Sequence, residues 1–84
     1  MKKETSYAKL DSYDYTFLTT KKGRITNIII KLESVNDVDV ADISGEVVAA
    51  DGKIYVEGYY FDYVAMYTYQ DGPDAYLDIE VKQI

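Results

Sequence analysis

Polar and apolar residues alternate with a period of two along most of the chain. This alternation is typical of β-strands that have one buried and one exposed face. It predicts strands at residues 12–20, 25–35, 43–50 and 75–81, and a longer extended segment at 53–70. In the last strand Leu77, Ile79 and Val81 are expected on the buried face, and Tyr76, Asp78 and Glu80 are expected on the exposed face.

Turn signals separate these strands at intervals of roughly ten residues. The sequence KKGR at 21–24 predicts a hairpin in which Gly23 adopts a positive φ, and the acidic stretch 36–42 predicts a second turn. Asp51-Gly52 is the strongest hairpin signal in the chain, and DGPD at 71–74 indicates another turn.

No stretch shows convincing helical periodicity, so short strands joined by consecutive hairpins predict an all-β fold. We expect a small antiparallel meander of about five to six strands that forms a twisted sheet, a sandwich or a partly open barrel. The length of 84 residues corresponds to a single domain, residues 1–84.

The segment 53–70 is rich in tyrosine and longer than typical strands, which span about 3–10 residues. It is predicted to bend at Gly58 or near Asp62, or to divide there into two strands. Because a bulge would exchange the two faces, a single face is expected only within 53–61 and, separately, within 63–69. If the segment is treated as one strand, the odd-numbered residues lie on one face, and this face carries Tyr55, Tyr59, Phe61, Tyr63, Tyr67 and Tyr69.

Two interpretations of these aromatic residues are open. In the first they fill a second layer of the core, with each hydroxyl group reaching the rim. In the second some of them stay exposed as a contact surface, because tyrosine is large, loses little rotamer entropy and keeps a polar tip. Such a surface would also be acidic, because Glu57, Asp62 and Asp71 lie near the tyrosines in the sequence.

The composition argues against several kinds of chemistry. Histidine and cysteine are absent, so the common general bases, thiol nucleophiles and His or Cys metal ligands are excluded, and we expect neither an enzyme nor a cofactor. Residues 36–42 carry carboxylates but lack the glycine and final glutamate of a calcium loop, which favours a solvated turn. No signal peptide or membrane span is recognisable, so a cytoplasmic protein without membrane contact is expected.

The net charge of −6 is unevenly distributed, since residues 1–31 are basic and residues 32–84 are acidic. Stacking of nucleic-acid bases on a β-surface requires a basic groove, and the tyrosine-rich segment lacks one, so direct nucleic-acid binding is not expected. The basic turn 21–24 is interpreted as a solvated hairpin tip.

The short, acidic, cysteine-free chain with its many tyrosines resembles a class of small proteins that phages and mobile elements use to block host enzymes. Anti-CRISPR, antirestriction and DNA-mimic inhibitors belong to this class, and the resemblance rests on size, charge and aromatic content. It implies a non-enzymatic protein-binding domain that inhibits a nucleic-acid-handling enzyme.

Carboxylates displayed on a rigid sheet can imitate a phosphate array and compete for a basic surface, while tyrosines supply desolvated anchors. The expected partner is therefore a protein with a basic surface, and a nucleic-acid-binding enzyme is the candidate. The candidate contact residues are Glu57, Asp62, Asp71, Asp74, Asp78 and Glu80, together with Tyr59, Tyr63, Tyr67, Tyr69 and Tyr76.

Two alternative functions fit the same sequence. A small β-module could stack its tyrosines on a small ligand or carbohydrate. A self-assembling structural protein could pair exposed edge strands between copies, and its basic and acidic parts would attract each other in a homodimer.

Overall fold

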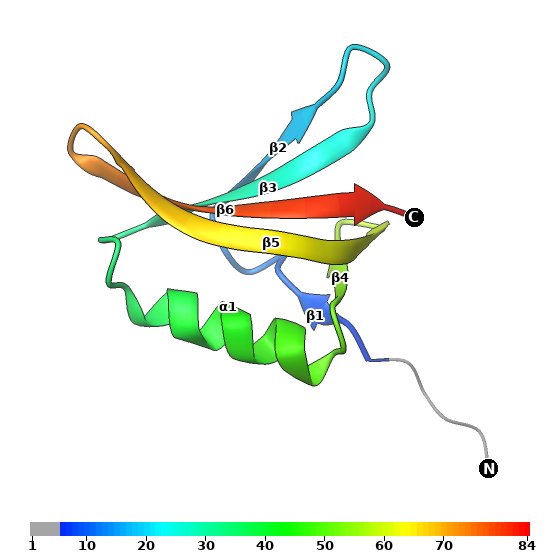
Figure 1. Cartoon of the computed structure of the whole chain (residues 1–84), viewed down its shortest axis with the longest axis horizontal. Coiled ribbons are helices and arrows are strands. Elements are labelled where there is room, and N and C mark those ends of the chain that lie inside the picture. Colours follow the sequence, from blue (N-terminus) through cyan, green and yellow to red (C-terminus); the bar gives the residue numbers. More distant parts are fainter. Residues whose placement is uncertain (1–5) are drawn as a thin grey trace.

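The computed structural model describes residues 6–84, which form a six-stranded mixed sheet and one α-helix (Figure 1). The order across the sheet is β1-β4-β5-β6-β3-β2, in which β1 runs parallel to β4 and the other neighbours are antiparallel. The elements are β1 (Ala8–Lys9), β2 (Tyr15–Thr19), β3 (Ile25–Leu32), α1 (Val38–Ala49), β4 (Lys53–Val56), β5 (Tyr59–Asp71) and β6 (Asp74–Gln83).

The sheet curls into a partly open barrel. Strands β2 and β5 are separated by two other strands, yet Phe17 and Phe61 contact each other with ring centroids 6.0 Å apart. This contact is possible only because the sheet bends around its inner face. The mostly-β fold with a partly open barrel confirms the fold class predicted from the alternation.

The hydrophobic core lies between the inner face of the sheet and helix α1, which runs along one side of the sheet in Figure 1. Phe61 and Ile79 are fully buried on the sheet, and Ile43 and Val47 are buried on the helix. No polar side chain is buried among residues 6–84. The stability of this small domain therefore comes from removing apolar surface from water, at roughly 25 cal/mol per Å².

Most of the predicted strands and two of the four predicted turns are found. The predicted strands 12–20, 25–35 and 75–81 contain β2, β3 and β6. Gly23 has a φ of 86° in the β2–β3 turn, and the β5–β6 hairpin turns at Gly72-Pro73 as expected. The two hairpins project from different ends of the sheet (Figure 1).

The predicted strand at 43–50 is wrong, because these residues belong to helix α1. Asp37 caps the helix, and its carboxylate accepts a hydrogen bond from the Asp39 N–H at 2.9 Å. The predicted turn at 36–42 is thus largely the first turn of a helix. Asp51 and Gly52 do not form a β-hairpin either; their φ angles of 55° and 79° end the helix and lead into β4.

The long segment 53–70 divides into two strands at Glu57-Gly58, which was one of the predicted alternatives. Both residues have a positive φ, as a two-residue hairpin turn requires. A register shift between Tyr63 and Ala65 then exchanges the faces of β5. Both expectations of a single face are therefore wrong. Within 53–61 the hairpin places Tyr55 on the outer face and Phe61 on the inner face, and within 63–69 the register shift exchanges the faces.

Candidate functional site

The outer face of the sheet, which points away from α1, carries a group of tyrosines and carboxylates on β5 and β6. In the strand register Tyr67 lies opposite Asp78, and Tyr69 lies opposite Tyr76. Directly paired residues share a face, so these side chains are neighbours. We call Tyr67, Tyr69, Tyr76, Asp78 and Glu80 the tyrosine–carboxylate patch.

The tyrosines of this patch are exposed although they are large. Tyr67 is 51% exposed and Tyr69 is 38% exposed. The rings of Tyr69 and Tyr76 stack with centroids 5.3 Å apart and an interplanar angle of 25°. Cross-strand stacking restricts both rings, so the patch offers a preformed aromatic surface.

Asp78 organises the polar part of the patch. Its carboxylate accepts a 2.8 Å hydrogen bond from Asn27 Nδ2 on the neighbouring strand β3. The negative charge of Asp78 is the main reason why the pKa of Tyr67 is raised, and burial followed by the same charge raises the pKa of Tyr69. Both hydroxyl groups therefore stay protonated at neutral pH and can donate hydrogen bonds.

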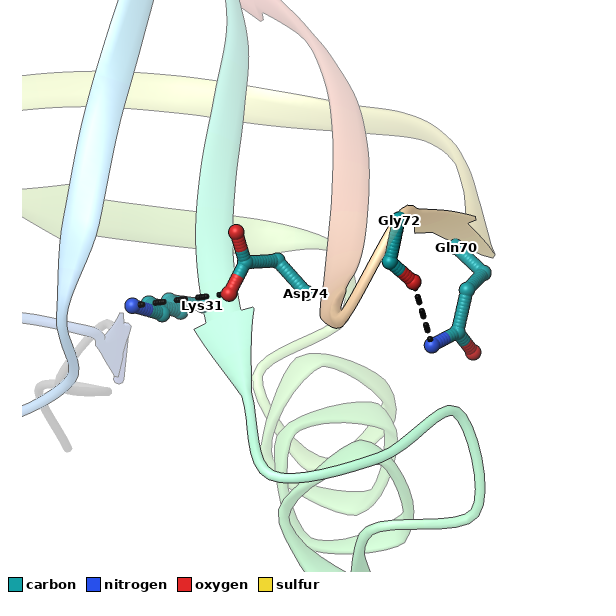
Figure 2. Close-up of polar contacts among 4 residues, drawn as sticks. All are labelled: Lys31, Gln70, Gly72 and Asp74. Carbon is teal, nitrogen blue, oxygen red and sulfur yellow. Dashed lines mark hydrogen bonds and ion pairs between the residues drawn. The ribbon is translucent and has the colours of Figure 1, made fainter.

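The β5–β6 hairpin continues the patch toward its tip (Figure 2). Asp74 faces Lys31 of β3, with Lys31 Nζ 3.9 Å from Asp74 Oδ1. Gln70 Nε2 donates a 3.2 Å hydrogen bond to the carbonyl oxygen of Gly72, the first residue of the turn. Asp71 lies opposite Asp74 in the register, so this end of the sheet carries a second carboxylate beside the Lys31–Asp74 pair.

The remaining predicted contact residues lie elsewhere. Asp62 is on the outer face but forms a 2.6 Å ion pair with Lys53, which neutralises it. Tyr63 lies on the inner side, where it lines a pocket of about 440 Å³ beside Val47 and Gly52 at the end of α1. The predicted site therefore divides, and the structure brings together only the part formed by β6 and the second half of β5.

Tyr59 and Glu57 are found at the mouth of the partly open barrel. Tyr59 makes an edge-to-face contact with Phe17 at 5.8 Å, so its ring packs against the inner face. Glu57 lies in the β4–β5 turn, and its backbone N–H donates a 2.7 Å hydrogen bond to Asp11. A hydrogen bond to the Glu57 carboxylate raises the pKa of Tyr15 to about 12.

Sequence reasoning missed a second aromatic group on the outer face, formed by Tyr7, Tyr55 and Tyr60. The Tyr60 ring centroid lies 5.1 Å from that of Tyr7 and 5.1 Å from that of Tyr55. These rings line a pocket of about 510 Å³ together with Lys9 and Ser6. The signal that could have revealed the group is the turn at Glu57-Gly58, because a two-residue hairpin pairs Tyr55 with Tyr60.

Within residues 6–84 no group of three or more carboxylates is placed to hold a metal ion. The helix of this described part is neither long nor apolar enough to cross a membrane. The chain matches no protein-family model, no curated protein and no solved structure. The tyrosine–carboxylate patch is a surface that can stack on other rings, donate hydrogen bonds and attract positive charge.

Proposed function

We propose that the protein is a non-enzymatic binding domain whose tyrosine–carboxylate patch docks on a basic surface of a partner protein. The observation that carries this proposal is the exposure of Tyr67 and Tyr69 beside Asp78, on a face that the core does not use. Exposed aromatic groups of this size are uncommon without a binding role.

The patch combines the two elements that such binding needs. Carboxylates attract a basic partner over a distance of about 10 Å at moderate salt, which accelerates the encounter. The stacked pair Tyr69–Tyr76 and the exposed ring of Tyr67 then bury apolar area in the complex. Because proteins that handle nucleic acids present basic surfaces, we propose an inhibitor of such an enzyme, of the DNA-mimic or phage anti-defence kind.

Affinity capture with matched baits tests this proposal. The baits are the wild type, a Tyr67→Ala/Tyr69→Ala variant, an Asp78→Asn/Glu80→Gln variant and a control, Asp42→Asn/Glu46→Gln. The control removes the same number of charges from exposed positions of α1. Proteins retained in about 0.05 M salt and released in about 0.5 M salt are identified by mass spectrometry.

We expect a nucleic-acid-binding protein with a basic surface to be retained by the wild type and by the α1 control. Retention should fall at least about tenfold with either patch variant. If every bait retains the same proteins, or if salt has no effect on the proteins retained, the proposal is wrong.

A second candidate function is favoured by the pocket that Tyr7, Tyr55 and Tyr60 line. Three tyrosine rings beside Lys9 and Ser6 suit a small polar ligand with a flat apolar side, such as a carbohydrate. NMR titration with a panel of mono- and disaccharides measures this directly. Saturable shifts of Tyr55 and Tyr60 that disappear in Tyr60→Ala would support it, and a panel without such shifts would refute it.

A further inference from the structure

The two edges of the sheet differ in their protection. At one edge β1 has only two residues and contains Lys9, which are common means of blunting an edge. At the other edge β2 has five residues with the sequence YTFLT, without charge or proline. Among residues 6–84 no strand pairs with the outward side of β2. The edge of β2 is therefore a template for another strand.

The backbone groups that this edge presents follow from the pairing with β3. The Lys31 N–H donates to the Asp14 carbonyl oxygen at 2.9 Å, and the Thr20 N–H donates to the Arg24 carbonyl oxygen at 2.8 Å. Even-numbered residues therefore hydrogen-bond toward β3, and by alternation the odd-numbered residues direct their N–H and C=O groups outward. The outward groups belong to Tyr15, Phe17 and Thr19.

Strand β2 is regular along this edge. Leu18 lies opposite Asn27, and Thr19 lies opposite Ile25, so the extra residue of the irregularity is Thr26 in β3. The bulge thus does not interrupt β2 itself. A partner strand can follow the edge from Tyr15 to Thr19 without a break.

We infer that β2 pairs antiparallel with β2 of a second copy of this chain, about a two-fold axis at Leu18. In this register Leu18, which is 47% exposed, lies against Leu18 of the other copy. The outward groups of Phe17 then bond to those of Thr19 in the other copy, as an antiparallel ladder requires.

Charge complementarity selects this register. With the axis at Leu18, Asp14 of one copy lies beside the basic β2–β3 turn of the other, which carries Lys22, and the two-fold symmetry makes this contact twice. Both side chains are exposed. Moving the axis to Thr16 would instead place Asp14 opposite Leu18, in the uncharged middle of the strand.

This pairing joins the two sheets into one, and both outer faces point to the same side because directly opposed residues share a face. The tyrosine–carboxylate patches of the two copies would then lie on a common surface. The inference does not depend on the proposed function, since it follows from the edge of β2 alone.

A charge exchange tests the register. Asp14 and Lys22 flank opposite ends of the five-residue strand β2, which is roughly 16 Å long, so they cannot form a pair within one chain. Sedimentation equilibrium of the wild type should show a concentration-dependent dimer. Asp14→Lys and Lys22→Asp should each weaken the dimer about tenfold, and the double variant should restore the wild-type Kd to within about threefold.

A backbone variant tests the edge itself. Thr19→Pro removes an outward N–H that β3 does not use, whereas the control Thr19→Ala keeps it. Only the proline variant should abolish the dimer, and both should keep the far-UV circular dichroism of the wild type. In hydrogen exchange, the amides of Tyr15, Phe17 and Thr19 should gain protection as the concentration rises.

Three outcomes would overturn the inference. The first is a monomer at every concentration, and the second is a double charge variant that is weaker than either single variant. The third is a dimer in which the amides of Tyr15, Phe17 and Thr19 exchange as fast as in the monomer. If Thr19→Pro itself unfolds, the charge exchange and the amide protection still decide the question.

Discussion

The inner and outer faces of the sheet are made by the same strands but carry different side chains. On β6 the inner face has Leu77 and Ile79, which are fully buried, whereas the outer face has Tyr76 and Asp78, which are half-buried. Helix α1 covers the inner face, and in the described chain nothing comparable covers the outer one (Figure 1). The difference indicates that the inner face provides stability, whereas the outer face stays exposed to solvent.

The largest expected effect comes from the inner face. Phe61→Ala removes a fully buried ring and should lower the free energy of unfolding by about 3–5 kcal/mol. Small domains have about 5–15 kcal/mol in total, so much of the stability would be lost. Urea denaturation measures the loss, and a change below about 1 kcal/mol would show that the inner face is not the core.

A matched pair on helix α1 sharpens the comparison. Val47 is 3% exposed and Val48 is 76% exposed. Val47→Ala should cost about 1.5–2.5 kcal/mol, whereas Val48→Ala should change the free energy of unfolding by no more than about 0.5 kcal/mol. Equal losses in urea denaturation would contradict the packing of α1 on the inner face.

Acid should weaken the start of the same helix. Backbone hydrogen bonds from the N–H groups of Asp39 and Glu33 lower the pKa of Asp37. The ionised carboxylate is thus favoured in the folded state, and its contribution is present above the unfolded pKa of about 3.9 and lost as the pH falls through the lower folded pKa.

The corresponding measurement is the Tm of Asp37→Ala across a range of pH. At pH 7 this variant should melt several degrees below the wild type, and the gap should close as the pH falls below about 4. Asp37→Asn serves as the control, because asparagine caps a helix but does not titrate. A gap that widens in acid would contradict the role of the Asp37 carboxylate.

The smallest effect on stability is expected on the outer face. Tyr67→Ala should leave the urea midpoint close to that of the wild type, because the ring is half exposed and contributes little to the core. Its effect should instead appear as weaker partner retention. A large loss of stability in Tyr67→Ala would remove the distinction between the two faces.

Short-range patterns were sufficient for much of the fold. Alternation located β2, β3 and β6 and assigned Leu77 and Ile79 to the inner face, because a strand exposes every second residue to the same environment. Glycine at positions that need a positive φ located the turns at Gly23 and Gly72.

The helix was missed because its residues fit two periods at once. Ile43 and Val47 are buried and four residues apart, which is a helical spacing. Because both are odd-numbered, they would also lie on the same face of a strand, together with Gly45. The cap at Asp37 and the packing of this stretch on the inner face stabilise the helix instead. Packing depends on contacts between segments that are distant in the sequence, and the local periodicity of the sequence does not reveal these contacts.

The candidate site was predicted only in part for a similar reason. Its residue types and its β6 members, Tyr76, Asp78 and Glu80, could be predicted from the sequence because β6 alternates without interruption. The turn at Glu57-Gly58 and the register shift after Tyr63 decided which tyrosines join them. The sequence by itself thus determined the alternation and the chemistry of the side chains. Only the tertiary structure decided which faces the residues of β4 and β5 take, because one turn or one bulge moves every residue that follows to the opposite face.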